Sequence, residues 1–223
     1  MLASGSTDAA FRVIDEEIER LGLGLDRCRL ASVAGDALVA SVQAWALERY
    51  GVRVEEAKVE AEACGLVNSY ERPEHMGVDR WLAAVAAFAQ CKSACLVVDC
   101  GSAVTVELIS ARGRHLGGYI VPGLRLMRRS LFQDTDAVKV AAAPLVANLS
   151  AGKNTADAVN RGLVLMVVGL IEKALAELTA ETSGPPPVLW VTGGDGKELM
   201  PFLPAPSRFE EQLVLDGLAR IIP

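Results

Sequence analysis

An apolar segment of the chain ends in a short glycine-containing turn, Asp99-Cys100-Gly101-Ser102. The residues from Ala94 onward predict a buried strand that delivers Asp99 to this turn. Gly101 permits close approach of the backbone to a ligand, and the hydroxyl groups of Ser102 and Thr105 are suited to phosphate oxygens. A carboxylate beside them is suited to holding a cation. The alternative is an ordinary β-hairpin with an Asp-x-Gly turn.

A second charged pair, Asp79 and Arg80, stands at the start of an apolar stretch that predicts a helix over residues 79–90. A carboxylate is favourable at that position because a helix N-terminus carries partial positive charge. Taken alone, however, the pair favours the simpler interpretation of a helix cap and a local ion pair.

Three further segments combine small or polar residues with the ends of predicted elements. Glycines at 117, 118 and 123 flank a short strand and indicate close approach of the backbone to another group. Asn154-Thr155 opens a long helix with donors suited to an anion or a carboxylate, although simple N-capping is favoured for these residues alone. Thr192-Gly193-Gly194-Asp195 is a strand-to-glycine turn. Neither G-x-G-x-x-G nor the Walker G-x-x-x-x-G-K-[ST] pattern occurs.

Composition narrows the class of protein. The chain has 223 residues, 51% of them hydrophobic, which is enough to build a sizeable core. A formal charge of -6 argues against a nucleic-acid-binding surface. No apolar run is long enough to span a membrane and no secretory leader opens the chain, so we expect no membrane association. The five cysteines form no C-x-x-C pair, which favours a reduced, cytoplasmic protein without a structural zinc site.

The elements that must position these residues fall into two groups. Helices are predicted over 7–21 and 36–50 and strands over 28–33 and 52–59, giving an α-β-α-β start. The later part predicts a three-stranded antiparallel meander followed by alternating helices and strands, the pattern of an RNase-H-like α/β domain. Its strands are expected at 94–99, 104–110, 115–120 and 188–192, and its helices at 79–90, 122–131, 154–182, 196–202 and 209–222. Residues 134–153 are expected to be the least regular.

Taken in order, these segments resemble the signature of type III pantothenate kinases, also called the Bvg accessory factor family. Tyr70 stands seven residues before Gly77, which is followed by Asp79-Arg80-Trp81. The family's D-x-G-T-A, G-G-x-I-x-P-G, helix-opening Thr and late T-G-G-D then match the segments at 99–103, 117–123, 155 and 192–195. The resemblance runs from about Cys28 to the C-terminus.

The resemblance implies an α/β fold made of two RNase-H-like halves, as in the acetate and sugar kinase/Hsp70/actin superfamily. The halves would be residues 1–78 and 79–223. It implies ATP-dependent phosphorylation of pantothenate to 4'-phosphopantothenate, the first step of coenzyme A biosynthesis. It further implies a homodimer, and ATP with Mg2+ and a monovalent cation, K+ or NH4+, as ligands.

The resemblance also implies roles for individual residues. Asp79 would be the general base that takes the proton from the pantothenate hydroxyl. Ser102 would contact ATP, and Asp99 would help to hold the monovalent cation. The pantothenate site would be lined by Tyr70, Gly77, Val78, Asp79, Arg80 and Thr155, and would form at the dimer interface.

The sequence departs from the family pattern at three places. Ser102 replaces Thr, and Glu107 stands where many members have Asp, which is expected to alter cation or water geometry. The third departure is that the family's opening D-x-G-N-[ST] phosphate-binding unit does not occur, so the N-terminal half is expected to be incomplete. This leaves two alternatives open: a non-catalytic or truncated relative that binds pantothenate or a partner without phosphoryl transfer, and a different kinase or phosphatase of the same superfamily.

Overall fold

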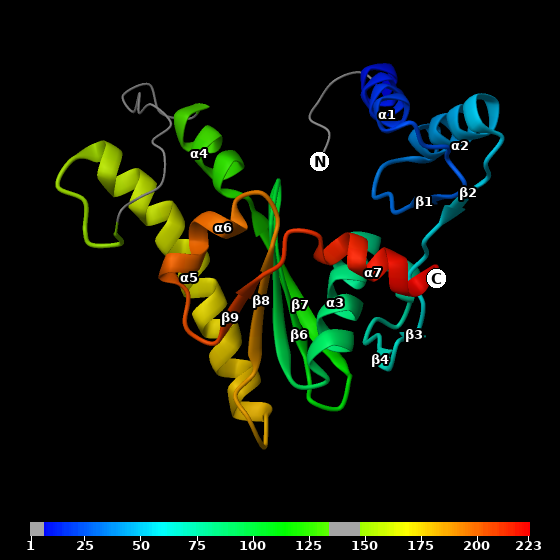
Figure 1. Ribbon diagram of the computed structural model, residues 1–223. Coiled ribbons are helices and arrows are strands. Elements are labelled where there is room, and N and C mark those ends of the chain that lie inside the picture. The colour runs from blue at the N-terminus through cyan, green and yellow to red at the C-terminus, as the bar shows by residue number, and fades with distance from the viewer. Residues whose placement is uncertain (1–6, 134–147) are drawn as a thin grey trace.

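The structure, a computed structural model, describes residues 7–133 and 148–223, and a five-stranded mixed sheet forms its centre (Figure 1). The strand order across the sheet is β7-β6-β5-β8-β9. The strands are β5 (Cys95–Cys100), β6 (Ala103–Ile109), β7 (His115–Pro122), β8 (Val188–Thr192) and β9 (Ser207–Phe209). The first three are antiparallel, and β8 and β9 run parallel to β5 on its other side. This arrangement confirms the predicted meander and is that of an RNase-H-like sheet.

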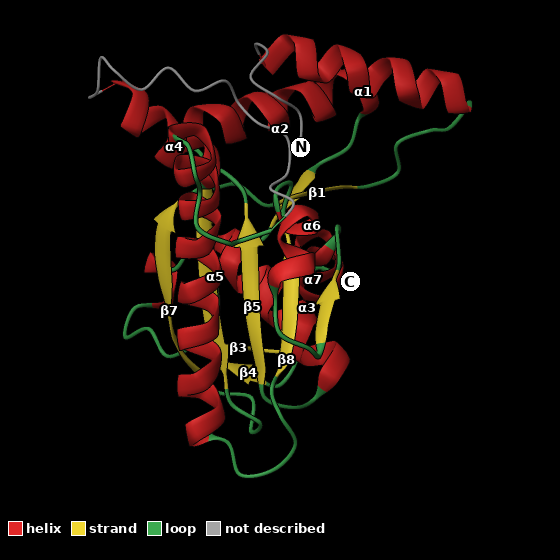
Figure 2. Cartoon of the chain, turned by 90° about the vertical axis from the view of Figure 1, so that its left-hand side faces the viewer, coloured by secondary structure: helices red, strands yellow, loops and turns green. Residues whose placement is uncertain are grey.

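Two layers of helix cover the two faces of this sheet, because alternate residues of β5 point to opposite sides. On one face, Leu96 and Val98 pack with α4 (Leu124–Gln133) and α5 (Thr155–Glu181). On the other face, Cys95 and Val97 pack with α3 (Val78–Cys91) and α7 (Leu213–Ile221). Figure 2 shows α5 crossing the sheet face that is toward the viewer.

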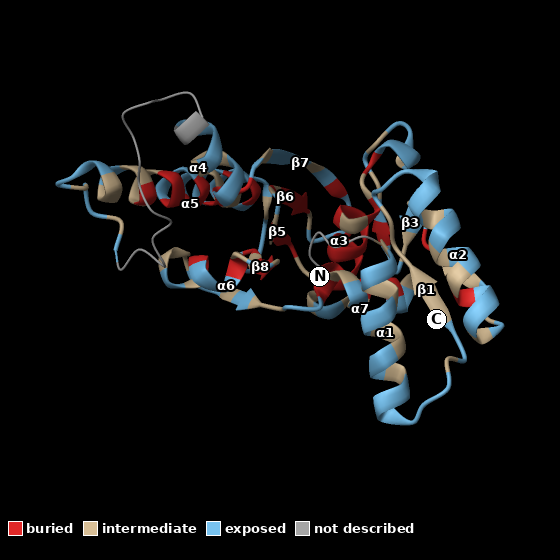
Figure 3. Cartoon of the chain, turned by 90° about the horizontal axis from the view of Figure 1, so that it is seen from above, coloured by how far each residue is buried: buried red, intermediate tan, exposed pale blue. Residues whose placement is uncertain are grey.

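Helix α3 is the most deeply buried helix in Figure 3, and it carries Asp79 at its start. Trp81 has no exposed surface, and the residues from Leu82 to Ala87 are almost wholly enclosed. Helix α7 lies directly against it: a Cβ added to Gly217 would lie 2.1 Å from the backbone oxygen of Leu82. Glycine is therefore needed at 217 for the two helices to approach so closely.

The N-terminal part is a smaller unit beside the sheet, and it confirms the α-β-α-β prediction. Its elements are α1 (Thr7–Leu21), β1 (Cys28–Leu30), α2 (Asp36–Tyr50) and β2 (Val54–Glu56). Strands β1 and β2 pair in parallel, and the Phe11 and Trp45 rings stack 4.9 Å apart between the two helices. Ala57 continues from β2 into a cluster with Val78, Leu82 and Leu218, which joins this unit to α3 and α7.

Several short elements differ from the predictions. The helix predicted from residue 209 begins only at Leu213, because residues 207–209 pair with β8 as the edge strand β9. A small hairpin of β3 (Glu62–Ala63) and β4 (Leu66–Val67) and a 3-10 turn, η1 (Pro73–His75), lie in the predicted loop before α3. The helix predicted over 196–202 is divided into α6 (Gly196–Leu199) and the 3-10 turn η2 (Met200–Phe202). Residues 134–147, most of the segment expected to be irregular, lie outside the described residues.

Candidate active site

Asp99 stands near the end of β5, where the sheet meets two glycine turns. The Asp99 carboxylate lies against Gly193, in the turn after β8: a Cβ on Gly193 would lie 2.4 Å from Asp99 Oδ1. Gly193 also has φ +86°, a backbone conformation that residues other than glycine rarely adopt. On the other side, a Cβ on Gly123 would lie 2.2 Å from the backbone oxygen of Gly101. The glycines at 123 and 193 are therefore required by close packing around the Asp99-Cys100-Gly101 turn.

Asp79 lies in the first turn of α3, and its Oδ1 accepts a hydrogen bond from the backbone N–H of Arg80 at 2.8 Å. The carboxylate is only partly buried. It does not pair with its neighbour Arg80, whose guanidinium is bonded elsewhere, so the ion-pair part of the simpler sequence interpretation is wrong.

The two carboxylates are close enough to influence each other. Burial raises the pKa of the Asp99 carboxyl to about 6, and the negative charge of Asp79 acts in the same direction. A like charge raises a carboxyl pKa only when the two groups are near each other in a poorly solvated region. The raised pKa of Asp99 therefore has two causes, burial first and the charge of Asp79 second.

A cleft of about 420 Å3 lies beside the Cys100-Gly101-Ser102 turn, at the ends of β5 and β8. Ser102 is exposed at its edge, and Arg125 donates a hydrogen bond to Asp195 across it at 3.1 Å. The cleft is lined by Cys100, Gly101, Ser102, Arg125, Leu126, Arg129, Gly194 and Asp195. Two arginines facing a glycine turn and a hydroxyl group form an environment suited to a polyphosphate.

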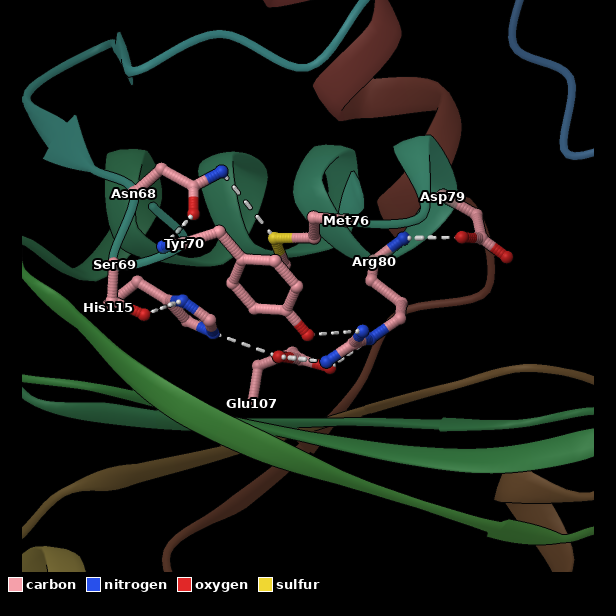
Figure 4. Close-up of polar contacts among 8 residues, drawn as sticks. All are labelled: Asn68, Ser69, Tyr70, Met76, Asp79, Arg80, Glu107 and His115. Atoms are coloured by element: carbon pink, nitrogen blue, oxygen red, sulfur yellow. Dashed lines mark hydrogen bonds and ion pairs between the residues drawn. The ribbon is translucent and has the colours of Figure 1, made fainter. Parts of the chain in front are cut away.

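The residues around Arg80 form a buried network that extends to the loop before α3 (Figure 4). Arg80 donates to Glu107 on β6 through Nε at 2.6 Å and Nη2 at 2.9 Å, and its Nη1 donates to the Tyr70 hydroxyl at 3.0 Å. His115 Nε2 lies 2.9 Å from Glu107 Oε2. These residues are buried: the exposed fractions of Arg80, Glu107 and His115 are only 7%, 1% and 2%. Both Glu107 carboxylate oxygens are thus engaged with Arg80 and His115.

The remaining candidate residues are placed differently from one another. Gly77 precedes α3, and a Cβ there would lie 2.7 Å from Asp79 Oδ1. The Val78 side chain is buried against Leu82 in the core, so its backbone is the part left for a ligand. Thr155 is exposed at the first position of α5, and Asn154 caps that helix by accepting a bond from Asp157 N–H at 2.9 Å.

Thr155 is also separated from Asp79 by the sheet. Helix α5 covers one face and α3 covers the other, as Figure 1 shows. Within one chain, the structure brings together Tyr70, Gly77, Asp79 and Arg80 on one side and Asp99 and Ser102 at the strand ends, but it does not bring Thr155 to Asp79.

Comparison with known proteins shows the family to which the chain belongs. The family model for type III pantothenate kinases matches residues 3–177. The chain belongs to the type III pantothenate kinase family. A type III pantothenate kinase of Azotobacter vinelandii is 37% identical over 233 residues, covering 97% of this chain and 92% of that protein. One from Pseudomonas aeruginosa strain LESB58 is 36% identical over 225 residues, covering 100% of this chain and 90% of that protein.

A solved structure supports the fold. A protein from Campylobacter jejuni described as a Baf family transcriptional activator aligns with a TM-score of 0.62 at 23% identity, covering 94% of this chain and 86% of that one. The predicted α/β fold with an RNase-H-like sheet is thus confirmed. The activity that belongs to the family is ATP-dependent phosphorylation of pantothenate in coenzyme A biosynthesis, so the chain is a kinase that uses ATP and a divalent metal.

Two parts of this family member's site were not assigned from the sequence. The spacing of Arg125 and Arg129 on a predicted helix is typical of a solvated face, and the structure places both at the cleft. The Glu107–His115 contact had one signal, the glycine pair at 117–118: a Cβ on Gly118 would lie 2.4 Å from Glu107 Oε2. No helix within residues 7–133 and 148–223 is long and apolar enough to cross a membrane.

Proposed function

We propose that this chain transfers the terminal phosphoryl group of ATP to the hydroxyl of pantothenate, with Asp79 as general base. The observation that carries the proposal is the position of Asp99 against the Gly193 turn, next to a cleft lined by Arg125, Arg129 and Ser102. The charge of Asp79 contributes to the raised pKa of the Asp99 carboxyl. A carboxylate at a helix start can accept the proton of a hydroxyl that lies within hydrogen-bond reach. The hydroxyl oxygen forms the new bond to phosphorus while the bond from the terminal phosphorus to the bridging oxygen of ADP breaks.

Most of the rate acceleration in such a transfer comes from positioning and charge neutralisation, because the transition state is loose and spreads negative charge over the phosphoryl oxygens. Ser102 and the Gly194 turn would contact the phosphates of ATP, and Arg125 and Arg129 would offset their charge. The raised pKa of the Asp99 carboxyl makes the ionised pair costly unless a cation is present.

The Asp99 carboxylate is therefore suited to a cation of the kind that the family implies. Carboxylate oxygens are among the oxygen ligands that hard cations such as Mg2+ prefer. Among the described residues, no group of three or more His, Cys, Asp or Glu is arranged to hold a metal ion, which favours Mg2+ carried by the triphosphate. Asp99 would help to hold the monovalent cation, K+ or NH4+, and such cations would supply further neutralisation of phosphate charge.

Pantothenate would lie against Tyr70, the Gly77–Val78 backbone, Asp79 and Arg80. Thr155 completes this set only if it comes from a second copy, since α5 and α3 of one chain lie on opposite sheet faces. Helix α5 also exposes apolar side chains, with Leu165 53% and Met166 63% exposed, as a surface buried in a dimer would. A homodimer is thus the expected assembly.

The proposal extends to the localisation, partners and domain division of the protein. We expect a cytoplasmic enzyme that binds neither nucleic acid nor membrane, in keeping with five free cysteines and a net charge of -6. The halves would be residues 1–78 and 79–223, with the site where they meet.

The test is ADP release with pantothenate, ATP, Mg2+ and K+, comparing wild type with Asp79→Asn. We expect the variant to keep the fold and lose about 10²–10⁴-fold in turnover, the range for general base catalysis. Asp216→Asn, on α7, is the matched control and should retain turnover. Equal rates for wild type and Asp79→Asn would remove Asp79 from this role, and pantothenate binding without any turnover in the wild type would favour a non-catalytic relative.

A further inference from the structure

A buried ion pair links the helix that carries Asp79 to the central sheet. The two hydrogen bonds from Arg80 to Glu107 use Nε and Nη2 of the guanidinium and both carboxylate oxygens. The side chains are 8% and 1% exposed. Buried charges are tolerated only when they are paired and fully hydrogen-bonded, so this geometry holds both groups firmly.

The pair has two further contacts, and both lead to the loop before α3. Arg80 Nη1 donates to the Tyr70 hydroxyl, and the guanidinium lies 5.8 Å from the centre of the Tyr70 ring. Because an ionised carboxylate only accepts hydrogen bonds, His115 Nε2 must carry the proton toward Glu107. In the neutral ring Nδ1 then accepts, and it lies 2.9 Å from Ser69 Oγ. Residues 69 and 70 are thus held from two directions.

The neighbouring strand leaves room for this arrangement. A side chain at Gly118 would meet Glu107 Oε2 at 2.4 Å and the backbone oxygen of Val106 at 2.3 Å. The network also directs the charge of Arg80: Figure 4 shows its guanidinium turned toward Glu107, while the Asp79 carboxylate points away from the network. Glu107 thus neutralises a cation that would otherwise be available to the adjacent Asp79.

We propose that Glu107 and His115 are positioning residues for pantothenate, which hold Tyr70 and the first turn of α3 in the arrangement that the substrate requires. The proposal rests on the proposed function, because it takes Tyr70 and Asp79 as pantothenate-binding. It assigns no chemical step to the network. The network would fix the residues on the pantothenate side of the site and make no contact with the cleft at Ser102 and Gly194.

The test compares His115→Leu with His115→Gln in the whole enzyme. Leucine removes both ring contacts, whereas the glutamine amide can still donate to Glu107. We expect His115→Leu to raise the KM for pantothenate by roughly tenfold, as loss of a hydrogen bond to a charged group implies, with the KM for ATP within about twofold of wild type. His115→Gln should recover most of the pantothenate KM.

A purely structural network would behave differently. Val168→Ala, in the core on the other face of the sheet, is the matched control: it should lower the melting temperature without separating the two KM values. The proposal is overturned if His115→Leu lowers thermal stability but leaves the pantothenate KM at the wild-type value, or raises both KM values equally. If His115→Leu does not fold, Ser69→Ala decides, because Ser69 is exposed and its loss removes only the outer contact.

For Ser69→Ala we expect a rise of roughly two- to fivefold in the pantothenate KM alone, and an unchanged value would also overturn the proposal. The outcome is separable from the test of Asp79. If Asp79→Asn keeps full turnover, the base assignment fails whatever the His115 variants do. If Asp79→Asn is inactive and the pantothenate KM of His115→Leu is normal, only the positioning proposal fails.

Discussion

Replacing Asp99 with asparagine should make the protein more stable and inactive. Burial and the charge of Asp79 raise the pKa of Asp99 from 3.8 to about 6. Above pH 6 Asp99 is therefore ionised in the folded protein, although its carboxyl group ionises more readily in the unfolded chain. The difference between the two pKa values corresponds to up to about 3 kcal/mol of lost stability. Asp99→Asn removes this cost, and for a chain of this size the melting temperature should rise by roughly 6–12 °C.

The pH dependence gives the sign of the effect. Between pH 3.8 and 6 the native state binds more protons at Asp99 than the unfolded state does, so the stability of the wild type falls as pH rises through this window. The advantage of Asp99→Asn should be largest at pH 8 and fall to about half at pH 5. Melting curves at fixed protein concentration, followed by circular dichroism at both pH values, measure it. Asp216→Asn should shift the melting temperature little at either pH.

Two outcomes would refute the reasoning. A lower melting temperature for Asp99→Asn at pH 8 would mean that the carboxylate is stabilised by contacts that offset its burial. An advantage that does not change between pH 8 and pH 5 would mean that Asp99 does not titrate in this range. Asp79→Asn should recover a smaller part of the stability, because the charge of Asp79 is the second cause of the raised pKa and burial is the first.

Three further perturbations test other parts of the site. Arg129→Ala should raise the KM for ATP about tenfold and leave the KM for pantothenate unchanged in steady-state assays, because Arg129 lines the cleft and would offset phosphate charge. Gly193→Ala should abolish turnover and lower the melting temperature, because its Cβ would meet Asp99 Oδ1 at 2.4 Å in a left-handed backbone conformation. Gly217→Ala should lower the free energy of unfolding, measured in urea, by about 1–3 kcal/mol, since its Cβ would lie 2.1 Å from the Leu82 oxygen. For each of the three variants, wild-type behaviour would contradict the contact on which the prediction rests.

Periodicity and turn residues were enough to predict most of the fold. The meander of β5, β6 and β7 and the long helix α5 have strong local signals, namely apolar runs bounded by glycines and the Asn154 cap. Strand β9 was missed because its three residues are short and lie beside a helical pattern that begins at Leu213. Its identity as a strand comes from pairing with β8, which is nearly twenty residues away and leaves little trace in the local sequence.

The candidate site also contains some residues that local sequence indicates and some contacts that it does not. Asp99 and Asp79 could be singled out because each stands at the end of an element, where local sequence indicates exposure to a ligand. The bond from Arg80 to Glu107 spans 27 residues, so no spacing rule identifies it. Arg125 and Arg129 lie one turn apart on a helix, and periodicity shows that they share a face without showing whether that face meets water or a cleft.

Helix α7 follows every other described element along the chain, yet it closes the back of α3, the helix that presents Asp79. During synthesis on the ribosome, residues 78–91 would emerge and begin to fold with one apolar side uncovered, until the segment around Gly217 arrives to cover it. The helix that presents Asp79 would therefore reach its native packing only after the segment around Gly217 has been made.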